Sequence, residues 1–456
     1  MSGATEHENF ASVEEIYQGL LARAPEHRMA PRLDAVQLAV SALGDPHRSA
    51  PVVQVTGTNG KTSTARMVES LLLAHDLRVG RYTSPHLERV TERISIDGEP
   101  VSDETFVRIY TEIAPYLDLV DRHLEGEGAP RLTYFETLTV LAFAVFADEP
   151  VDVMVLEVGI GGSWDATTVA DAAVSVVTPV DLDHTDILGD TVEDIAREKA
   201  GIVKPGGFLV SSAQQPGAAQ VLLERAQELG VPFRFEGVEF SVTARTTAVG
   251  GQVVTVQGLA GEYPDVMLPL FGAHQAQNAA VAIAAVEALL GGGEKPLNPE
   301  LVSEGLGAVS SPGRLELART APPVILDAAH NPHGLVASAA AVREAFTFSK
   351  LNLVVGVLGD KDVETMMRVL ADEYHEFELE LWCTASHSPR AVPPAELAEI
   401  AVDMGFDEDA VHVAERLDDA CSEAIQDAAA REQFDGAVLV TGSITVVGEA
   451  RALLGL

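Results

Sequence analysis

The segment Val52–Met67, VVQVTGTNGKTSTARM, constrains the fold of this chain more than any other stretch. The apolar run Pro51–Val55 is typical of a buried parallel strand, and apolar residues recur at helical spacing over Lys61–His75. A usual phosphate-binding loop reads G-x-x-x-x-G-K-[ST], but Val55 stands where its first glycine belongs, and the nearest upstream glycine is Gly57. The segment therefore indicates either a shortened nucleotide-binding loop or a plain strand-turn-helix connection.

The same alternation of strand and helix recurs along the chain. Short β-branched runs are typical of buried strands, and longer runs with apolar residues at helical spacing are typical of amphipathic helices. The sequence predicts helices at Thr133–Ala147 and Gly217–Leu229, and strands at Val151–Glu157, Ala173–Thr178 and Pro205–Val210. This order predicts an α/β fold in which a parallel sheet carries helices on both faces.

Two later segments depart from this alternation. Arg234–Leu268 is rich in Thr and Val and punctuated by glycine, which is typical of an antiparallel hairpin, and we expect it to extend the main sheet. Gln275–Leu290 predicts a long alanine-rich helix that ends at three consecutive glycines. A polar stretch with Pro and Gly follows, up to SSPGRLE at 310–316. We therefore predict a boundary between a first domain, residues 1–310, and a second, residues 311–456.

The predicted second domain repeats the strand-helix pattern on a smaller scale. Its strands read PVILDAAHNP, LNLVVGVLGDKD, LELWCTASHSPR and AVLVTGSITVVG, and each runs from apolar residues into a polar tip. The carboxyl ends of parallel strands line the ligand crevice of an open sheet, so we expect these tips to face a ligand. The tips are Asp327, Asp360–Asp362, Ser386–Arg390 and Thr441–Ser443.

Composition limits the classes of partner. With 47% hydrophobic and 22% charged residues, the 456-residue chain is long and apolar enough for two or three folded domains. Its formal net charge of −39 argues against nucleic acid or an anionic membrane as a partner. The longest apolar run, Thr137–Ala147, is too short to span a bilayer, and no signal sequence opens the chain. The two cysteines lie too far apart to indicate a disulfide framework or a zinc site, so we expect a cytoplasmic protein.

Lysine is scarce, so a chain that handles anions is expected to use its few lysines at working positions. Lys61 opens the helix after the glycine turn, where unpaired backbone N–H groups favour a phosphate. Gly57 and Gly60 let the backbone approach that phosphate, and the Thr62 hydroxyl can reach Mg²⁺. Such a turn is more often only a connection, but the Lys-Thr pair favours nucleotide binding. The remaining lysines are Lys199, Lys204, Lys295, Lys350 and Lys361.

Two acidic segments are candidates for a metal or phosphoryl site. Glu157 ends a predicted strand immediately before a glycine turn, where a carboxylate is either a solvated loop residue or a ligand. In VDLDHTD, 180–186, carboxylates flank His184 at a strand tip, and a helix bearing Lys199 follows. A lone loop histidine is usually structural, but one among carboxylates in a chain with a phosphate loop indicates Mg²⁺ or phosphoryl chemistry.

Nine motifs together make the sequence recognisable. TGTNGKTS, YTSPHL, LTYFE, EVGIGG with WDAT, DLDHTDILG, REKAGI, SPGRLE, DAAHNP and GDKD occur in this order between residues 56 and 362. Each motif alone is weak, but in register they closely resemble folylpolyglutamate synthase/dihydrofolate synthase, of the Mur-type ligase superfamily. The resemblance implies a P-loop central domain with a parallel sheet, followed by a smaller Rossmann-like α/β domain. It also implies that the shortened loop binds nucleotide.

The resemblance assigns roles to matching positions. Lys61, His184 and Lys199 are implied to be catalytic, and Lys199 is implied to carry a carbamate derived from CO₂, which presents oxygen rather than an ammonium to Mg²⁺. The implied ATP contacts are Thr58, Asn59, Gly60, Lys61, Thr62, Asn278, Arg314, Asp327 and His330. The implied metal ligands are Ser84, Glu157, His184 and Lys199. The implied pocket for the pterin-bearing substrate contains Thr133, Tyr134, Phe135, Glu136, Trp164, Asp165 and Ala166.

The chemistry that the resemblance implies is ATP-driven amide formation. A substrate carboxylate attacks the γ-phosphate, and L-glutamate then displaces phosphate from the acyl phosphate, with Lys61, two Mg²⁺ ions and Arg314 supplying positive charge. The acceptor is dihydropteroate, a reduced folate with a γ-glutamate tail, or both. Arg390, at a strand tip, is a candidate to bind a glutamate carboxylate, although a plain surface arginine explains it equally well. We expect a monomer without nucleic-acid or membrane partners.

Two alternatives remain open from the sequence. One is a cell-wall ligase acting on a UDP-linked muramyl substrate, which shares the phosphate loop, although TSPHL followed by LTYFE favours the folate branch. The other is a nucleotide-dependent switch or binding module, in which VDLDH serves as a Walker B strand. If ATP hydrolysis requires both L-glutamate and a pteroate, the protein is a folate ligase and neither alternative holds.

Overall fold

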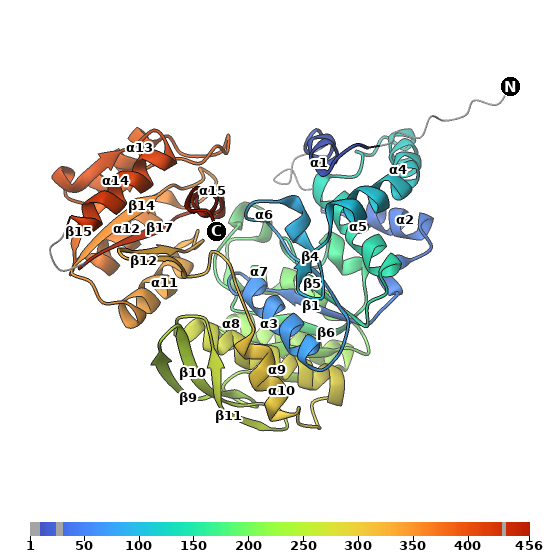
Figure 1. Ribbon diagram of the computed structural model, residues 1–456. Helices are drawn as coiled ribbons and strands as arrows, with labels where there is room; N and C mark the ends of the chain where they lie inside the picture. The colour runs from blue at the N-terminus through green and yellow to red at the C-terminus, as the bar shows by residue number, and fades with distance from the viewer. Residues whose placement is uncertain (1–9, 24–30, 431–434) are drawn as a thin grey trace. The chain divides into compact units, whose positions relative to one another are not determined.

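The computed structural model describes residues 10–23, 31–430 and 435–456, which form two compact units (Figure 1). The first unit comprises the described residues up to Thr243 together with Thr255–Val266 and Gln277–Ala308. The second comprises Ala244–Val254, Met267–Ala276 and Val309–Leu456. The second unit thus takes in two segments that precede the predicted boundary at residue 310, and that boundary stays a prediction.

The first unit is built on an eight-stranded sheet. Strands β2, β5, β1, β6, β7 and β8 run parallel to one another, whereas β3 pairs antiparallel with both β2 and β4 at one edge. The predicted parallel sheet and the α/β class are therefore confirmed. In spatial order the strands are β4 (Glu99–Pro100), β3 (Ile94–Ile96), β2 (Val79–Tyr82), β5 (Val153–Glu157), β1 (Val52–Thr56), β6 (Ala172–Val177), β7 (Phe208–Ser211) and β8 (Phe233–Phe235).

Helices pack on this sheet as the strand-helix alternation predicts. Helix α3 begins directly after the phosphate loop and buries the apolar stripe that its sequence predicts. Between β2 and β5, the chain forms α4, a long helix that the sequence analysis did not predict. The helices of this unit and those near it in sequence are α1 (Val13–Leu21), α2 (Asp34–Ala42), α3 (Lys61–Ala74), α4 (Asp103–Gly126), α5 (Tyr134–Asp148), α6 (Thr185–Leu188), α7 (Val192–Lys199), α8 (Pro216–Leu229), α9 (Ala273–Gly291) and α10 (Pro299–Gly307).

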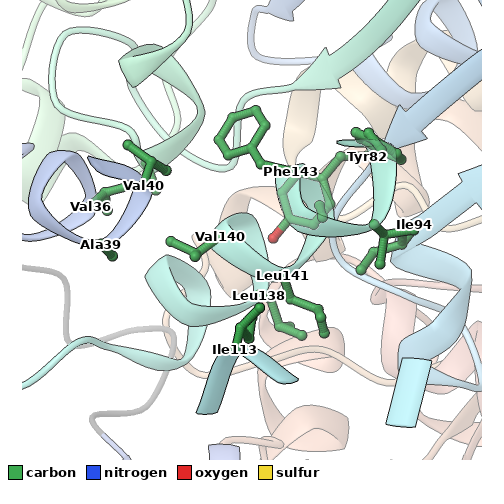
Figure 2. Packing of buried hydrophobic residues seen from close by; sticks show 14 of the residues in the cluster. Val36, Ala39, Val40, Tyr82, Ile94, Ile113, Leu138, Val140, Leu141 and Phe143 are labelled. Carbon is green, nitrogen blue, oxygen red and sulfur yellow. The ribbon is translucent and has the colours of Figure 1, made fainter. Parts of the chain in front are cut away.

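Helix α5 is the centre of the largest core region of the first unit. It is apolar almost all round, which is typical of a helix buried on every side, and nearly all of its residues are buried. Figure 2 shows its side chains among those of α2, α4, β2 and β3. Because α5 is enclosed in this way, the TYFE segment at its start has a fixed position. The labelled residues are Val36, Ala39, Val40, Tyr82, Ile94, Ile113, Leu138, Val140, Leu141 and Phe143.

The prediction for Arg234–Leu268 is wrong in part. Instead of a hairpin that extends the main sheet, β9 (Ser241–Ala248), β10 (Gly251–Gln257) and β11 (Glu262–Leu268) form a separate three-stranded sheet. Only β8, just before them, joins the main sheet, as a parallel edge strand. Alternating polar and apolar residues predict that a strand has one buried face, but they do not specify which sheet it pairs with.

The second unit contains a six-stranded sheet. Its strands are parallel except for β12, which pairs antiparallel with β13 at one edge. The four predicted strands correspond to β13, β17, β14 and β15, whereas β12 and β16 were not predicted. In spatial order the strands are β12 (Glu316–Thr320), β13 (Pro323–Leu326), β17 (Gly436–Thr441), β14 (Lys350–Val355), β15 (Glu378–Cys383) and β16 (Val411–Val413). The helices are α11 (Pro332–Ala345), α12 (Val363–Tyr374), α13 (Pro394–Asp403), α14 (Leu417–Ala429) and α15 (Ile444–Leu454).

Across the part of the chain that the structure describes, no helix is both long and apolar enough to cross a membrane.

Candidate active site

The phosphate loop connects β1 to α3 through two glycines with positive φ. Gly57 has φ 145° and Gly60 has φ 87°. A Cβ added to Gly57 would lie 1.9 Å from the Thr178 hydroxyl oxygen, so no other residue fits there without a shift of the backbone. The Thr58 hydroxyl donates to the Asp181 carbonyl at 2.9 Å and accepts from the Asp181 N–H at 3.0 Å. The loop is therefore fixed against the segment that follows β6.

Lys61 is the first residue of α3, and its ammonium group curls back over the loop. Nζ donates to the carbonyl oxygens of Gly57 at 3.1 Å and Thr58 at 3.0 Å. The positive charge thus lies beside the N-terminus of α3, where unpaired backbone N–H groups also favour an anion. The shortened loop has the geometry of a phosphate cradle.

Glu157 contacts two other residues that the sequence analysis assigned to metal or nucleotide. It ends β5 and is buried. Its Oε1 accepts from the Thr62 hydroxyl at 2.8 Å, and its Oε2 accepts from the Ser84 N–H at 3.3 Å. The structure therefore brings Thr62, Ser84 and Glu157 together, with oxygen atoms beside the start of α3.

Lys199 ends α7 and is buried with its ammonium nitrogen at the same loop. Nζ donates to the Gly57 carbonyl at 2.9 Å, so this one oxygen accepts from both Lys61 and Lys199. Burial, and to a lesser extent the charge of Lys61, lower the pKa of Lys199 to about 7, although Asp183 and other nearby carboxylates oppose the shift. An amine with such a pKa is substantially uncharged near neutral pH.

His184 caps the short helix α6 in the left-handed conformation, with φ 51°. Its side chain is half-buried, and its Nε2 lies 3.9 Å from Asp183 Oδ1. Among the described residues, no group of three or more His, Cys, Asp and Glu side chains converges as a metal cage. Mg²⁺ in nucleotide sites commonly takes one or two carboxylates and completes its shell with phosphates and water. The carboxylate of Glu157, which lies beside the start of α3, fits that requirement.

The glycine turn after β5 packs directly on the end of α7. Ser163 N–H lies 2.8 Å from Glu198 Oε1 and 3.1 Å from the Glu198 carbonyl. A Cβ on Gly162 would lie 2.8 Å from the carbonyl oxygen of Lys199. The EVGIGG and REKAG motifs, forty residues apart, are thus two sides of one contact that places Lys199.

Asp165 has a structural environment. Its Oδ2 accepts from the N–H groups of Gly159 at 3.0 Å and Ile160 at 3.3 Å, and its Oδ1 accepts from the Thr167 N–H at 2.9 Å. Burial raises the pKa of Asp165 to about 6, although these donors favour the ionised form. Its neighbour Trp164 is half-buried, and Ala166 is buried in the short turn that follows. Asp165 therefore shapes the loop from which Trp164 projects.

The TYFE segment begins α5 with a capping box. Thr133 accepts from the Glu136 N–H at 3.2 Å, and Glu136 accepts from the Thr133 N–H at 2.7 Å. Arg32 binds both oxygens of Glu136, at 3.0 and 3.1 Å. The side chains of Thr133 and Glu136 are thus engaged in fixing the helix start, which leaves Tyr134 and Phe135 as the residues with other contacts. Arg32 belongs to no motif, so the sequence analysis missed it.

Two aromatic contacts place the middle of that segment. The Phe135 ring centroid lies 6.0 Å from that of Tyr82 on β2. A Cβ on Gly159 would lie 2.7 Å from Phe135 Cζ, so Phe135 also covers the glycine turn after β5. Of the predicted acceptor residues, Phe135 therefore packs on the turn after β5, and Trp164 belongs to the same turn, directly before Asp165.

Asn278 lies against the phosphate loop. It is a buried residue of α9, and a Cβ added to Gly60 would come within 2.7 Å of its Oδ1. The side-chain amide of Asn278 can lie this close to the loop because Gly60 has no side chain. The sequence analysis assigned Asn278 to nucleotide binding, and the structure puts it beside the loop.

Four predicted site residues belong to the second unit. Asp327, at the end of β13, is buried and accepts from the Leu315 N–H at 3.2 Å, and burial raises its pKa. His330 Nδ1 donates to the Ala328 carbonyl at 2.9 Å. Arg314 is half-buried. Arg390 forms an exposed ion pair with Asp360 at 3.1 Å, which joins two of the predicted strand tips.

Comparison with known proteins identifies the class. A model of the Mur ligase middle domain matches residues 55–286, and one of the Mur ligase glutamate-ligase domain matches residues 313–444. A phosphate loop on a parallel sheet, followed by a second α/β unit, therefore defines a ligase of the Mur type.

Individual relatives are more specific. The chain is 44% identical to the dihydrofolate synthase/folylpolyglutamate synthase of Mycobacterium tuberculosis, over 98% of this chain and 95% of that protein. The crystal structure of folylpolyglutamate synthase from M. tuberculosis complexed with ADP and AMPPCP matches with a TM-score of 0.91 at 43% identity, covering 97% and 98% of the two chains. Escherichia coli FolC in complex with DHPP and ADP matches with a TM-score of 0.83 at 28% identity, covering 99% of both chains.

This chain belongs to the dihydrofolate synthase/folylpolyglutamate synthase family, a family of ADP-forming ligases. The resemblance drawn from the nine sequence motifs is thereby confirmed.

Replacement of Asp165 by Asn tests the structural role of its carboxylate. In Asp165→Asn, one oxygen becomes an NH₂ group that faces backbone N–H donors, so we expect a loss of about 1–3 kcal/mol in the free energy of unfolding. Denaturant unfolding measures this loss. Asp171→Asn, at an exposed position six residues on, is the matched control and should leave stability unchanged. Equal stability of the two variants would contradict the structural role.

Proposed function

We propose that the protein is an ATP-dependent ligase that joins L-glutamate to dihydropteroate, to the γ-carboxyl of reduced folates, or to both, and releases ADP and phosphate. The observation that carries this proposal is the phosphate loop, where Lys61 and Lys199 meet at one carbonyl oxygen beside Glu157. The relatives support it, since their structures hold ADP, AMPPCP and DHPP.

The reaction requires two anions to meet. The acceptor carboxylate attacks the γ-phosphate of ATP, which forms an acyl phosphate and ADP, and the amine of L-glutamate then attacks the acyl carbon and expels phosphate. Carboxylate and triphosphate repel each other, so catalysis consists mainly of positioning and charge neutralisation. Lys61 and the N-terminus of α3 supply fixed positive charge at the phosphates. Thr58, Asn59, Gly60, Thr62 and Asn278 complete the phosphate end of the nucleotide site, and Arg314, Asp327 and His330 are proposed as further nucleotide contacts.

Two Mg²⁺ ions are proposed, and the chain offers a different ligand set for each. Glu157 and Ser84 would hold one ion together with phosphate oxygens, and His184 and Lys199 would hold the other. When bound, the ions withdraw charge from the phosphate oxygens as Lewis acids. The unmodified Lys199 amine donates to the Gly57 carbonyl and is no ligand for Mg²⁺, so the second set requires a carbamate on Nζ.

The environment of Lys199 favours that carbamate. Only an uncharged amine attacks CO₂, and the lowered pKa of about 7 makes this form available at neutral pH. The added carboxylate would also replace an ammonium group that lies close to the charge of Lys61. Burial protects the product from exchange with solvent.

The substrate residues are proposed from the same fold. The acceptor site is proposed to contain Thr133, Tyr134, Phe135, Glu136, Trp164, Asp165 and Ala166. Thr133, Glu136 and Asp165 also fix the segments that carry the others. Arg390 is proposed to bind a glutamate carboxylate, which requires it to leave its exposed partner Asp360. We also propose a domain boundary at residue 310, a monomeric state and a cytoplasmic location. The net charge of −39 disfavours nucleic acid as a partner.

A product assay tests the function. With ATP, Mg²⁺ and L-glutamate, we expect amide products from dihydropteroate, from tetrahydrofolate, or from both, assayed side by side. Lys61→Ala should lower the rate at least about a hundredfold, because it removes charge at the phosphates, while its melting temperature stays near that of the wild type. Lys295→Ala, which removes an exposed lysine, is the control.

Other outcomes of the same assay separate the alternatives. Ligation to a UDP-linked muramyl substrate instead would indicate a cell-wall ligase. ATP hydrolysis that needs neither L-glutamate nor a pteroate would indicate a nucleotide-dependent switch. Wild-type turnover in Lys61→Ala would contradict the assignment of the phosphate loop.

The metal assignment predicts a change in magnesium dependence. Glu157→Gln and His184→Ala should each raise the Mg²⁺ concentration needed for half-maximal rate, by about tenfold or more, because each removes a proposed ligand. Rates measured over a series of Mg²⁺ concentrations check this. Glu224→Gln and His375→Ala, both at exposed positions, are the controls. If the first two variants keep the wild-type dependence, the cation lies elsewhere.

The carbamate predicts a pH-dependent modification. With ¹³C-labelled bicarbonate, a carbamate signal from Lys199 should grow as pH rises through about 7, since the fraction of uncharged amine grows over that range. Lys199→Ala should lose activity and recover part of it with acetate or propionate, which resupply the anion. Lys204→Ala is the control and should keep both the signal and the activity. Two results together would remove Lys199 from the metal site: full activity of Lys199→Ala, and absence of the carbamate signal from the wild-type protein.

A further inference from the structure

Arg93 is a buried cation that contacts residues of two sequence motifs. It ends the short helix η2 (Val90–Arg93), and it is 2% exposed. Its Nε donates to His86 Nδ1 at 2.9 Å, and its guanidinium carbon lies 5.1 Å from the centroid of the Tyr134 ring. One buried cation therefore contacts His86 of the TSPHL motif and Tyr134 of the TYFE motif.

This contact fixes the chemical form of His86. A guanidinium group only donates hydrogen bonds, so Nδ1 of His86 accepts with its lone pair. In the uncharged imidazole the proton must then lie on Nε2, whereas an imidazolium would turn an N–H toward the donor Nε of Arg93. Arg93 thus selects one tautomer and one ring orientation, as a hydrogen-bond partner does for a catalytic or metal-bound histidine.

A third ring completes the arrangement. Tyr17 of α1 lies edge-on to His86, with ring centroids 5.7 Å apart at 74°, and edge-on to Tyr134, at 6.2 Å and 66°. Edge-to-face pairs at these separations are favourable and restrict the tilt of each ring. We call Tyr17, His86 and Tyr134 the aromatic wall. Its members come from three separate segments, and Arg93 contacts two of them.

The position of the aromatic wall points to the acceptor. Tyr134 precedes Phe135, which covers the glycine turn after β5, and His86 lies two residues after Ser84, whose N–H contacts Glu157. The ring of His86 is half-buried, so part of it can meet a ligand. The Tyr134 ring is 1% exposed, so it supports the aromatic wall from the interior and does not itself meet a ligand.

We propose that Arg93 is a positioning residue of the ligase: it holds His86 as the Nε2–H tautomer and keeps the buried Tyr134 ring in a fixed orientation, so that the exposed part of His86 is preorganised to meet the flat ring system of the acceptor. This proposal rests on the proposed function for its ligand. Arg93 acts through His86 and Tyr134 and needs no contact with the acceptor. Its loss should therefore weaken acceptor binding while the ATP site is unaffected.

The tautomer is tested first, on the enzyme without substrates. In ¹⁵N-labelled protein, the ring nitrogens of His86, assigned by comparison with His86→Phe, should show the Nε2–H form. Arg93→Met should convert this signal to a mixture of tautomers, and Arg93→Lys, which keeps a donor, should restore much of it. If His86 in the wild type is the Nδ1–H form, or if its signal is unchanged in Arg93→Met, then Arg93 does not determine the tautomer of His86.

Kinetics test the link to the acceptor. Arg93→Met and His86→Phe should each raise KM for the acceptor about tenfold, the size expected for one lost hydrogen bond, with kcat and KM for ATP within about twofold of wild type. The double variant should be no worse than the poorer single one, because two residues that act through one contact are not additive. Arg89→Met, which breaks an exposed ion pair in the same loop, is the matched control and should change nothing.

Three results would overturn the acceptor role. The first is an unchanged KM for the acceptor in the single variants. The second is a rise of about a hundredfold in KM for the acceptor in the double variant. The third is an equal rise in KM for ATP and for the acceptor, which indicates general unfolding. If Arg93→Met does not fold, Arg93→Lys and His86→Phe carry the same comparison. Failure of the wild type to ligate glutamate to any pteroate would refute the proposed function, and the tautomer experiment would still decide whether Arg93 fixes His86.

Discussion

The carbonyl oxygen of Gly57 accepts hydrogen bonds from two lysines, and the arrangement of the candidate site depends on this convergence. Lys61 reaches it from the start of α3, at 3.1 Å, and Lys199 reaches it from the end of α7, at 2.9 Å. Burial, reinforced by repulsion from the Lys61 ammonium at the same oxygen, lowers the pKa of Lys199 to about 7. The loop thus combines a permanent cation for phosphate with an amine that can lose its charge.

Backbone geometry makes this convergence possible. Gly57 turns the carbonyl into position only because it lacks a Cβ, since any Cβ would collide with Thr178. The opposite side of the contact is built by Gly162, which lets the turn after β5 lie against the backbone of Lys199. The glycines of two distant motifs therefore serve one purpose: they bring backbone close enough for lysines and phosphate to meet.

The carboxylates of the first unit divide into two groups by the donors around them. Glu136 and Asp165 are engaged with Arg32, backbone N–H groups or both, and these contacts hold helix starts and turns in place. Glu157 instead contacts the Thr62 hydroxyl and the Ser84 N–H beside the start of α3, groups that a cation could rearrange without breaking the fold. Sequence reasoning grouped Glu136 and Asp165 with the substrate pocket, and that assignment stays a prediction, since a residue that supports a segment can also contact a ligand.

What the sequence by itself determined is local and periodic: the β1-loop-α3 connection, the strand-helix alternation in both predicted domains and the helix that corresponds to α5. These follow from glycine placement and apolar spacing, which act over a few residues. The family followed from the nine motifs taken together. Only the tertiary structure decided that β9, β10 and β11 form their own sheet, that Arg32 pairs with Glu136, and that Arg93 contacts His86 and Tyr134. Strand partners and the pairing of buried charges depend on which distant segments pack together, and no local pattern encodes that choice.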